Sequence, residues 1–282
     1  MRCAAIRNTE LGVASALLFM LLVSWAAAQS PELSNIDLCN GTDRTSAQHQ
    51  IAGCTALVES DQKNPQVLAI AYNNRGNAYI RKGEYELAMR DYNESIRNKP
   101  DYAKPANNRG VAYQKMGDFD RALQDFTAAI TIDPNYADAF ANRAETYRKK
   151  GDYPLALKDF DEAIRLQPSL GTLWNERCWT RAISGELQAA LTDCNEALRL
   201  EPNVAATFDS RGLTYLKLAQ WELAIADYNS ALRVDPKLPT ALYGRGFAKL
   251  KTADQNGGNA DIAAAQMLER NMAEQFAGYG LR

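Results

Sequence analysis

The sequence predicts an all-α solenoid of antiparallel helix pairs, because two features repeat through most of its 282 residues. Prolines stand at Pro100, Pro134, Pro168, Pro202 and Pro236, each 34 residues beyond the one before. Side chains of one kind also recur at fixed places within that period. An internal period of about 20–50 residues is typical of stacked repeats, in which each unit buries its apolar face against the next.

Taking the proline as position 32 divides most of the chain into six units. They span residues 69–102, 103–136, 137–170, 171–204, 205–238 and 239–272. Positions 8 and 20 are small in these units, which lets two helices approach closely. Positions 4 and 24 are mostly bulky, with Tyr92, Phe126 and Phe160 at position 24 of the first three units. This is the spacing of an apolar helical face, so we expect these aromatic groups to fill the core.

Each unit contains the signals of a helix, a tight turn and a second helix. Position 15 is Gly83, Gly117, Gly151 and Gly185 in the first four units, and an acidic residue follows each glycine. Glycine accepts the left-handed conformation just past a helix end, and an acidic residue favours the start of the next helix. The proline at position 32 then ends the second helix.

These columns closely resemble the tetratricopeptide repeat, which has small residues at positions 8 and 20, an aromatic residue at 24 and proline at 32. The resemblance covers residues 69–272 and implies a right-handed superhelical solenoid. The last unit departs from the pattern, because Asn256-Gly257-Gly258-Asn259 replaces good helix formers and Arg270 occupies the proline column. We expect residues 273–282 to form a C-terminal capping helix, since solenoids need a polar end piece.

The N-terminus indicates export. Arg2 and Arg7 precede an apolar stretch from Leu11 to Val23, and small residues then stand at Ala26 and Ala28. This order is typical of a secretory signal peptide over residues 1–28, and predicts a periplasmic or secreted protein with no integral membrane span after cleavage. An uncleaved anchor is the alternative, although the apolar stretch is shorter than the roughly 20 residues that a span needs.

The cysteines fit an oxidising compartment. Cleavage would remove Cys3 and leave four, and an even number in an exported protein predicts disulfides. Cys54 occupies position 24 of a divergent helical hairpin that we expect over residues 29–68, and Cys194 occupies the same position in a later unit. We therefore expect Cys39 to pair with Cys54 and Cys178 with Cys194, each bond joining the two helices of one hairpin.

Composition and motifs argue against several classes of protein. The net charge is -2 with basic and acidic residues interspersed, whereas nucleic-acid binders usually have a basic face. His49 is the one histidine, and no phosphate loop, metal-ligand cluster or nucleophile elbow is present, so we expect no catalysis, metal or cofactor.

Two columns are invariant across the six units. Position 7 is always arginine and position 23 is always aspartate. They face one another in a hairpin that turns between positions 15 and 16, so we expect ion pairs that fix the hairpin register rather than a basic ladder for an acidic ligand. The expected pairs are Arg75–Asp91, Arg109–Asp125, Arg143–Asp159, Arg177–Asp193, Arg211–Asp227 and Arg245–Asp261.

The resemblance implies that first-helix positions 2, 5, 9, 12 and 13 line a concave groove. This lining is polar to basic in the first two units and apolar in later ones, and asparagine amides suit the backbone of an extended peptide. The groove predicted to bind peptide comprises Asn73, Asn77, Arg81, Lys104, Asn107, Lys115, Trp179, Leu213 and Phe247. Alternatively, the C-terminal helix covers its apolar end. Position 5 lacks the lysine with which some family members bind chaperone carboxylates.

The function expected from these features is that of a periplasmic interaction scaffold. It would hold a peptide or a partner protein in its groove and help to assemble or regulate an envelope complex. The alternative is an accessory that handles a small ligand or polysaccharide, since Trp179 and Tyr243 could stack on sugar rings. An enzyme comes third, because the sequence offers no catalytic motif.

Overall fold

The structure is a computed structural model that describes residues 34–41, 45–61 and 64–281. The expected signal peptide at 1–28 lies outside these residues. Fifteen helices and no strands occupy the described segments, and none of these helices is long and apolar enough to cross a membrane. The helices are α2 (Asn35–Asn40), α3 (Ala47–Glu59), α4 (Pro65–Lys82), α5 (Tyr85–Asn98), α6 (Ala103–Lys115), α7 (Phe119–Ile132), α8 (Ala137–Lys150), α9 (Tyr153–Leu166), α10 (Gly171–Ser184), α11 (Leu187–Leu200), α12 (Ala205–Lys217), α13 (Trp221–Val234), α14 (Pro239–Lys251), α15 (Gln255–Leu268) and α16 (Met272–Gly278).

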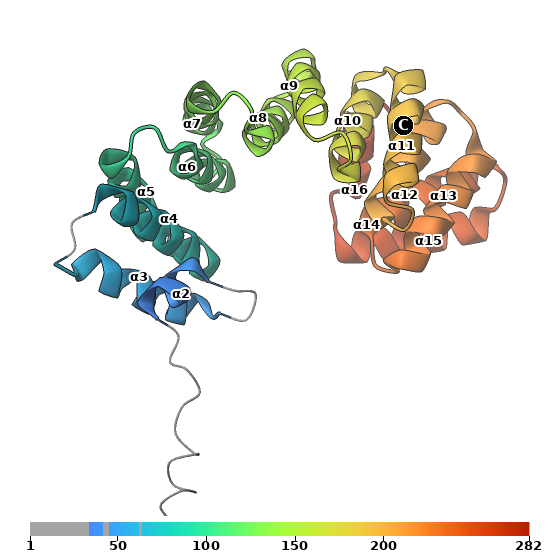
Figure 1. Cartoon of the computed structure of the whole chain (residues 1–282). Helices are drawn as coiled ribbons and strands as arrows, with labels where there is room; N and C mark the ends of the chain where they lie inside the picture. The colour runs from blue at the N-terminus through green and yellow to red at the C-terminus, as the bar shows by residue number, and fades with distance from the viewer. Residues whose placement is uncertain (1–33, 42–44, 62–63, 282) are drawn as a thin grey trace, which may run out of the picture.

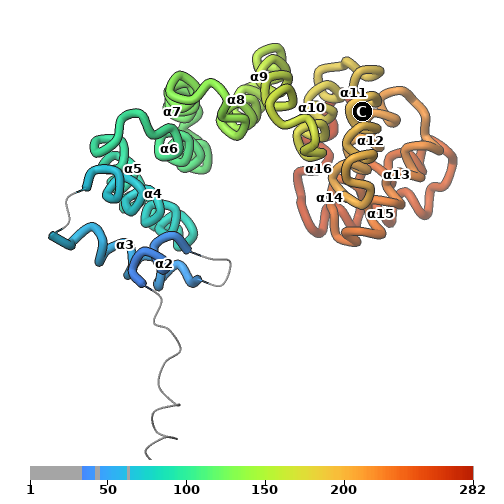
Figure 2. Tube along the Cα trace, in the orientation of Figure 1, coloured from blue at the N-terminus to red at the C-terminus, as the bar shows by residue number. Residues whose placement is uncertain are grey.

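The helices form the expected solenoid of antiparallel pairs. Each first helix packs against the second helix of its own pair, and each second helix packs against the first helix of the next pair. The chain follows an arc in which α6, α8 and α10 lie on the inner side and α7 and α9 on the outer side (Figure 1). The trace shows α16 returning to the inner side beside α10 and α14 (Figure 2).

The turn inside each pair uses the left-handed backbone conformation. Gly83, Gly117, Gly151 and Gly185 have φ between 76° and 98°. The same column holds Ala219 and Ala253 in the last two units, with φ of 56° and 65°. A Cβ is unfavourable in this region, so the last two turns carry backbone strain that the first four lack.

Small residues at position 8 allow the two helices of a pair to approach. A Cβ placed on Gly76 or Gly110 would lie 2.7 Å from the ring of Tyr92 or Phe126, the position-24 residue of the same unit. Both rings are buried. The packing of the aromatic ring against the glycine backbone therefore sets the spacing of the two helices in these units. A larger residue at position 8 would collide with the ring.

Both ends differ in detail from the boundaries expected from the sequence. The first hairpin is formed by α2 and α3, but α4 already begins at Pro65, inside the range assigned to that hairpin. Asn64 caps α4 by accepting from the amides of Gln66 and Val67, and proline suits the first helical position. At the other end, α16 stops at Gly278, and Gly280 has a φ of 86°.

The interior changes character along the solenoid. The largest group of contacting buried apolar side chains lies between Cys178 and Phe276, and includes Leu213, Leu216 and Tyr228. The earlier pairs contain several smaller apolar groups, such as the one at Ala103, Ala106, Ala129 and Ala139. The C-terminal half thus has one continuous apolar cluster, whereas the N-terminal half has several smaller ones.

Replacing Ala219 by glycine should raise the free energy of unfolding by about 0.5–1 kcal/mol, because glycine removes the left-handed strain at this turn. Urea unfolding followed by circular dichroism measures the change. The reverse substitution, Gly151→Ala, is the control. No atom lies within 4 Å of the added Cβ, so this change affects only the backbone conformation. That variant should be less stable by a similar amount. If Ala219→Gly were less stable than wild type, the proposal that Ala219 strains the backbone at this turn would be wrong.

Candidate functional site: the concave groove and its polar cavity

Each position-7 arginine forms a two-pronged ion pair with the position-23 aspartate of its own hairpin. In every unit Nε and one terminal nitrogen of the guanidinium donate to the two carboxylate oxygens, at 2.6–2.8 Å. The six aspartates are buried. These parallel hydrogen bonds hold the two helices in one register.

The remaining terminal nitrogen of each guanidinium reaches the preceding repeat. It donates to a side chain at position 25 of that repeat, so each arginine connects three helices. The acceptors are Thr55, Asn93, Thr127, Asp161, Asn195 and Asn229, in the order of the arginines. All three donor groups of each arginine are therefore engaged within the solenoid, which supports the structural interpretation over a ladder for an acidic ligand.

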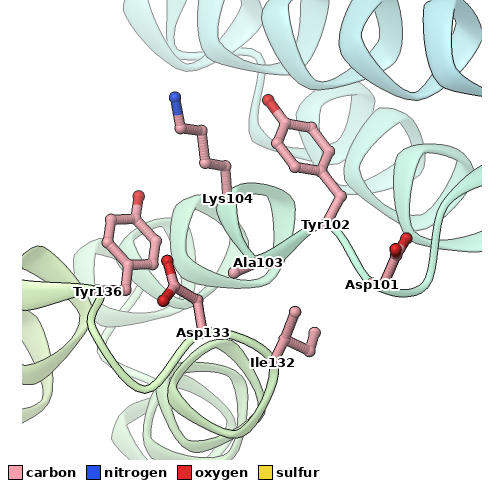
Figure 3. A pocket seen from close by; sticks show the side chains of 7 residues that line it. All are labelled: Asp101, Tyr102, Ala103, Lys104, Ile132, Asp133 and Tyr136. Atoms are coloured by element: carbon pink, nitrogen blue, oxygen red, sulfur yellow. The ribbon is translucent and has the colours of Figure 1, made fainter.

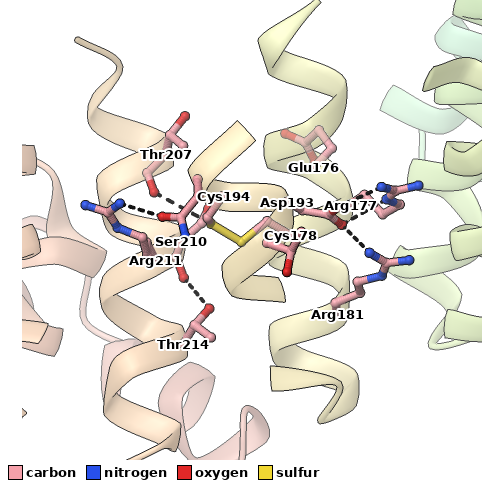
Figure 4. The surroundings of a disulfide bond; sticks show 12 residues. Glu176, Arg177, Cys178, Arg181, Asp193, Cys194, Thr207, Ser210, Arg211 and Thr214 are labelled. Atoms are coloured by element: carbon pink, nitrogen blue, oxygen red, sulfur yellow. Dashed lines mark hydrogen bonds and ion pairs between the residues drawn. A yellow bond between two sulfur atoms is a disulfide. The ribbon is translucent and has the colours of Figure 1, made fainter. Parts of the chain in front are cut away.

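Two cysteine pairs lie at bonding distance. The sulfur atoms of Cys39 and Cys54 are 2.07 Å apart, and those of Cys178 and Cys194 are 1.97 Å apart. Cys178 and Cys194 occupy positions 8 and 24, so a covalent bond replaces the contact between glycine and an aromatic ring in this unit. Figure 4 shows the bond beside the ion pair of Arg177 with Asp193, which Arg181 also contacts.

The predicted asparagine contacts to a peptide need correction at Asn73 and Asn107, because both side chains are buried. Each Oδ1 accepts from the position-6 asparagine of the next repeat, namely from Asn108 and Asn142, at 2.9 Å. We call these interrepeat contacts the asparagine ladder. Their amides stabilise the packing of α4, α6 and α8 and are not available to a ligand.

The other polar residues predicted for the groove lie nearer the surface. Asn77 accepts from the Tyr92 hydroxyl at 2.7 Å, and Arg81 donates to Gln50 of the first hairpin. Lys104 and Lys115 are exposed. Their role in binding a ligand stays a prediction.

Lys104 borders a hollow of about 380 Å³ at the starts of α6 and α8. Figure 3 shows Tyr102, Lys104 and Tyr136 pointing to the same side of it. Burial raises the pKa of Tyr136 to about 12, so this phenol stays protonated at neutral pH. No residue that lines the hollow has a buried side-chain nitrogen or oxygen without a hydrogen bond. We therefore place the stronger candidate site elsewhere in the groove.

The apolar half of the predicted groove also needs correction. Leu213 is 1% exposed and belongs to the core between α12 and its neighbours, so it cannot contact a ligand. The C-terminal segment occupies part of this surface: Tyr279 packs edge-on against Trp179, with ring centres 5.4 Å apart, and Phe276 lies against Tyr243 at 4.6 Å. Phe247 is half-buried and carries the Lys251 ammonium over its ring.

A polar cavity of about 300 Å³ remains beside the C-terminal segment. It opens at the inner side of α8, α10, α12 and α14, and Trp179 forms part of its wall. The remaining lining residues are Arg148, Asn175, Glu176, Ala206, Asp209, Ser210, Thr240 and Tyr279. Six of the nine lining residues occupy the groove positions 2, 5, 9 and 12 that the resemblance implied, but Trp179 is the one member of the predicted peptide-binding set among them.

Two buried polar atoms on the lining have no hydrogen-bond partner. They are Oδ1 of Asn175 and Nε of Arg148, one an acceptor and one a donor. Asn175 stands at position 5, where the asparagine ladder would continue, but the next repeat has Ser210 instead of asparagine at position 6. The Ser210 hydroxyl donates to the Ala206 carbonyl instead. Buried polar atoms are normally paired, so this cavity offers unused hydrogen bonds to a ligand.

Asp209 contributes a carboxyl group of unusual basicity. It is buried and accepts a hydrogen bond of 2.6 Å from the Thr240 hydroxyl. Burial raises the pKa of Asp209 from 3.8 to about 7, and the hydrogen bond from Thr240 opposes that rise. The carboxyl group can therefore be either neutral or charged near neutral pH, depending on what binds beside it.

Two family models match the chain. The one described as tetratricopeptide repeat matches residues 103–136 and 137–170, and the one described as TPR repeat matches 76–117 and 212–252. The chain is a tetratricopeptide-repeat protein. No curated protein matches its sequence significantly. No enzyme family is indicated, and the described residues include no group of three or more histidine, cysteine, aspartate or glutamate side chains placed to hold a metal ion.

Several solved structures share the tetratricopeptide-repeat fold. A tetratricopeptide repeat protein from Parabacteroides merdae is 17% identical, with a TM-score of 0.65 over 84% of this chain and 94% of that one. YrrB, described as a TPR protein with an unusual peptide-binding site, is 18% identical, with a TM-score of 0.51 over 67% of this chain and 98% of that one. One chain of the APC/C hetero-tetramer Cut9–Hcn1 is 17% identical, with a TM-score of 0.67 over 86% and 50%. These likenesses show the fold alone.

The repeat columns contain a signal that points to the cavity. Position 5 is asparagine in the first, second and fourth tetratricopeptide repeats and Asp209 in the fifth. Position 6 is asparagine in the first three repeats and changes to Glu176, Ser210 and Gly244 in the last three. Comparing the two columns reveals that Asn175 and Asp209 have lost the amide that pairs with Asn73 and Asn107. The part played by Tyr279 had no such signal, since it follows from how the chain folds back after α15.

Replacing Asp159 by alanine should lower the free energy of unfolding by up to about 3 kcal/mol, because the largely buried Arg143 guanidinium would lose its charged partner. The matched control is Glu162→Ala, which breaks the exposed pair with Arg165 and should change stability by about 0–1 kcal/mol. Denaturant unfolding of both variants measures the difference. Unchanged stability of Asp159→Ala together with lost ligand binding would show that the arginines act in recognition.

The Asp209 carboxyl should also make stability depend on pH. Its pKa is raised in the folded protein, so the native state keeps a proton that the unfolded chain releases between pH 3.8 and about 7. The stabilisation is complete below the unfolded pKa and is lost as pH rises to the folded pKa. Asp209→Asn should remove this loss, and make the protein more stable than wild type at pH 8 by on the order of 3 kcal/mol. Melting curves from pH 4 to pH 8 measure it, with exposed Asp138→Asn as control, and parallel wild-type and Asp209→Asn curves would contradict the assignment.

Proposed function

We propose that the protein is an exported interaction scaffold that binds an extended peptide segment of a partner in its concave groove. In this role it would assist the assembly or regulation of an envelope complex. The observation that carries the proposal is the cavity between α8 and α14, because it combines an aromatic wall with buried hydrogen-bonding atoms that no protein group uses.

The chemistry of the cavity suits a peptide. A peptide supplies carbonyl acceptors, which could pair with Nε of Arg148, and N–H donors, which could pair with Oδ1 of Asn175. Trp179 would then hold an apolar part of the peptide, as aromatic anchors commonly do at protein interfaces. The exposed Lys104 and Lys115 lie on α6, a first helix earlier in the solenoid, where a longer partner could extend.

Two features support an oxidising compartment outside the cytoplasm. The sequence begins with the pattern of a signal peptide, and both disulfide pairs are buried within hairpins. Structural disulfides persist in the periplasm and in secreted proteins but are rare in the cytosol.

A polysaccharide or small ligand is the second candidate, and Trp179 is the feature in its favour. Aromatic side chains can stack on sugar rings, but Tyr243, which we expected to assist, is in contact with Phe276. The solved tetratricopeptide-repeat protein YrrB is described as having a peptide-binding site. The balance of these features favours a peptide.

Trp179→Ala should weaken the binding of peptides by roughly thirtyfold, because truncation of an aromatic anchor typically costs about 2 kcal/mol or more. Arrays of extended peptides and of glycans, followed by titration of the best ligands, would measure this effect. Leu223→Ala is the control, since this side chain is 49% exposed on α13, a second helix. The Leu223→Ala variant should bind peptides as tightly as wild-type protein does. Glycan binding without any peptide binding, lost in Trp179→Ala, would overturn the peptide proposal in favour of the alternative.

A further inference from the structure

Asp209 differs from the other buried aspartates in having no cation beside it. Seven aspartates are buried in the described part of the chain, and six of them are the partners of the position-7 arginines. No lysine or arginine among the described residues forms an ion pair with Asp209, whose one hydrogen bond comes from Thr240. Buried carboxylates are normally paired with a cation, because removal from water disfavours the charged form.

A second acceptor lines the same cavity as Asp209. The Asn175 side chain is 7% exposed, its Oδ1 is unpaired, and both residues line the same cavity. The charged lining residues are Arg148, Glu176 and Asp209, so the cavity has a net charge of -1 when Asp209 is ionised. Arg148 lies 3.6 Å from Glu176, which offsets its positive charge.

We propose that this cavity binds the protonated primary amine of a lysine side chain in the peptide, with the ammonium group donating to the Asp209 carboxylate and to Oδ1 of Asn175. This inference rests on the proposed function, because the lysine is taken to belong to the bound peptide. The lysine ammonium of the peptide would then pair with Asp209, as an arginine of the protein pairs with each of the other six buried aspartates.

The other lining residues suit the same ligand. An indole wall attracts a cation through the negative face of its ring, and Trp179 provides one. The unpaired Nε of Arg148 can donate to a backbone carbonyl of the peptide that brings the lysine. An ammonium is a compact point charge with three donors, so it can donate to more than one acceptor of the lining.

Acetylated, amidated pentapeptides with a single variable central residue provide the test. Lysine at the centre should bind wild-type protein at least about tenfold more tightly than norleucine or Nε-acetyl-lysine, which keep the chain but lose the charge. Calorimetric titration gives the three dissociation constants. Equal affinity for the lysine and norleucine peptides would overturn the ammonium site and leave the peptide groove standing.

Two variants connect the preference to the carboxylate. Asp209→Asn keeps the size of the side chain and an acceptor for Thr240, and should abolish the preference for lysine over norleucine. Asp138→Asn removes an exposed carboxylate from the first turn of α8 and should retain it. Melting curves confirm that both variants fold. A lysine preference that survives in Asp209→Asn would overturn the proposal.

A small diamine separates the ammonium site from the peptide function. If 1,5-diaminopentane binds wild-type protein as tightly as the lysine peptide, and Asp209→Asn loses both, the ammonium site is supported and the peptide function fails. If the diamine binds much more weakly than the peptide, the backbone contributes and both proposals are supported.

Discussion

The buried pair between the position-7 arginine and the position-23 aspartate determines the geometry of the hairpin in each of the six tetratricopeptide repeats. Its two parallel hydrogen bonds fix how far one helix is displaced along the other, and its third nitrogen fixes the distance to the preceding repeat. One side chain therefore controls both the pairing within a repeat and the stacking between repeats. The curvature of the groove and the placement of its lining follow from this repeated contact.

Two kinds of packing meet at the cavity. The asparagine ladder connects α4, α6 and α8, and it ends where position 6 ceases to be asparagine. The continuous apolar core begins at Cys178 and runs to Phe276. Asn175 lies at the junction, with its carbonyl oxygen unpaired, and Asp209 follows one repeat later. The cavity is thus a consequence of changing from polar to apolar packing within one solenoid.

The repeat period predicts whatever is local to one hairpin: the glycine turns, the six ion pairs and the pairing of Cys178 with Cys194 all follow from column positions that face one another. Contacts between repeats were harder to predict. Asn73 and Asn107 have the polarity of ligand-binding residues, yet the position-6 amide of the next repeat buries them. Leu213 faces the core instead of the groove, and the placement of Tyr279 over Trp179 depends on the path of the chain after α15.

The bond between Cys178 and Cys194 has a consequence for how the stack comes apart. In a linear array each repeat is held by its two neighbours, so opening begins at an end and advances inward. The disulfide between Cys178 and Cys194 keeps α10 and α11 paired even when α12 has detached from them. Loss of α12 therefore leaves the hairpin of α10 and α11 covalently closed. Such opening would separate Asp209 and Thr240 from Asn175 and Trp179, and so take the cavity apart.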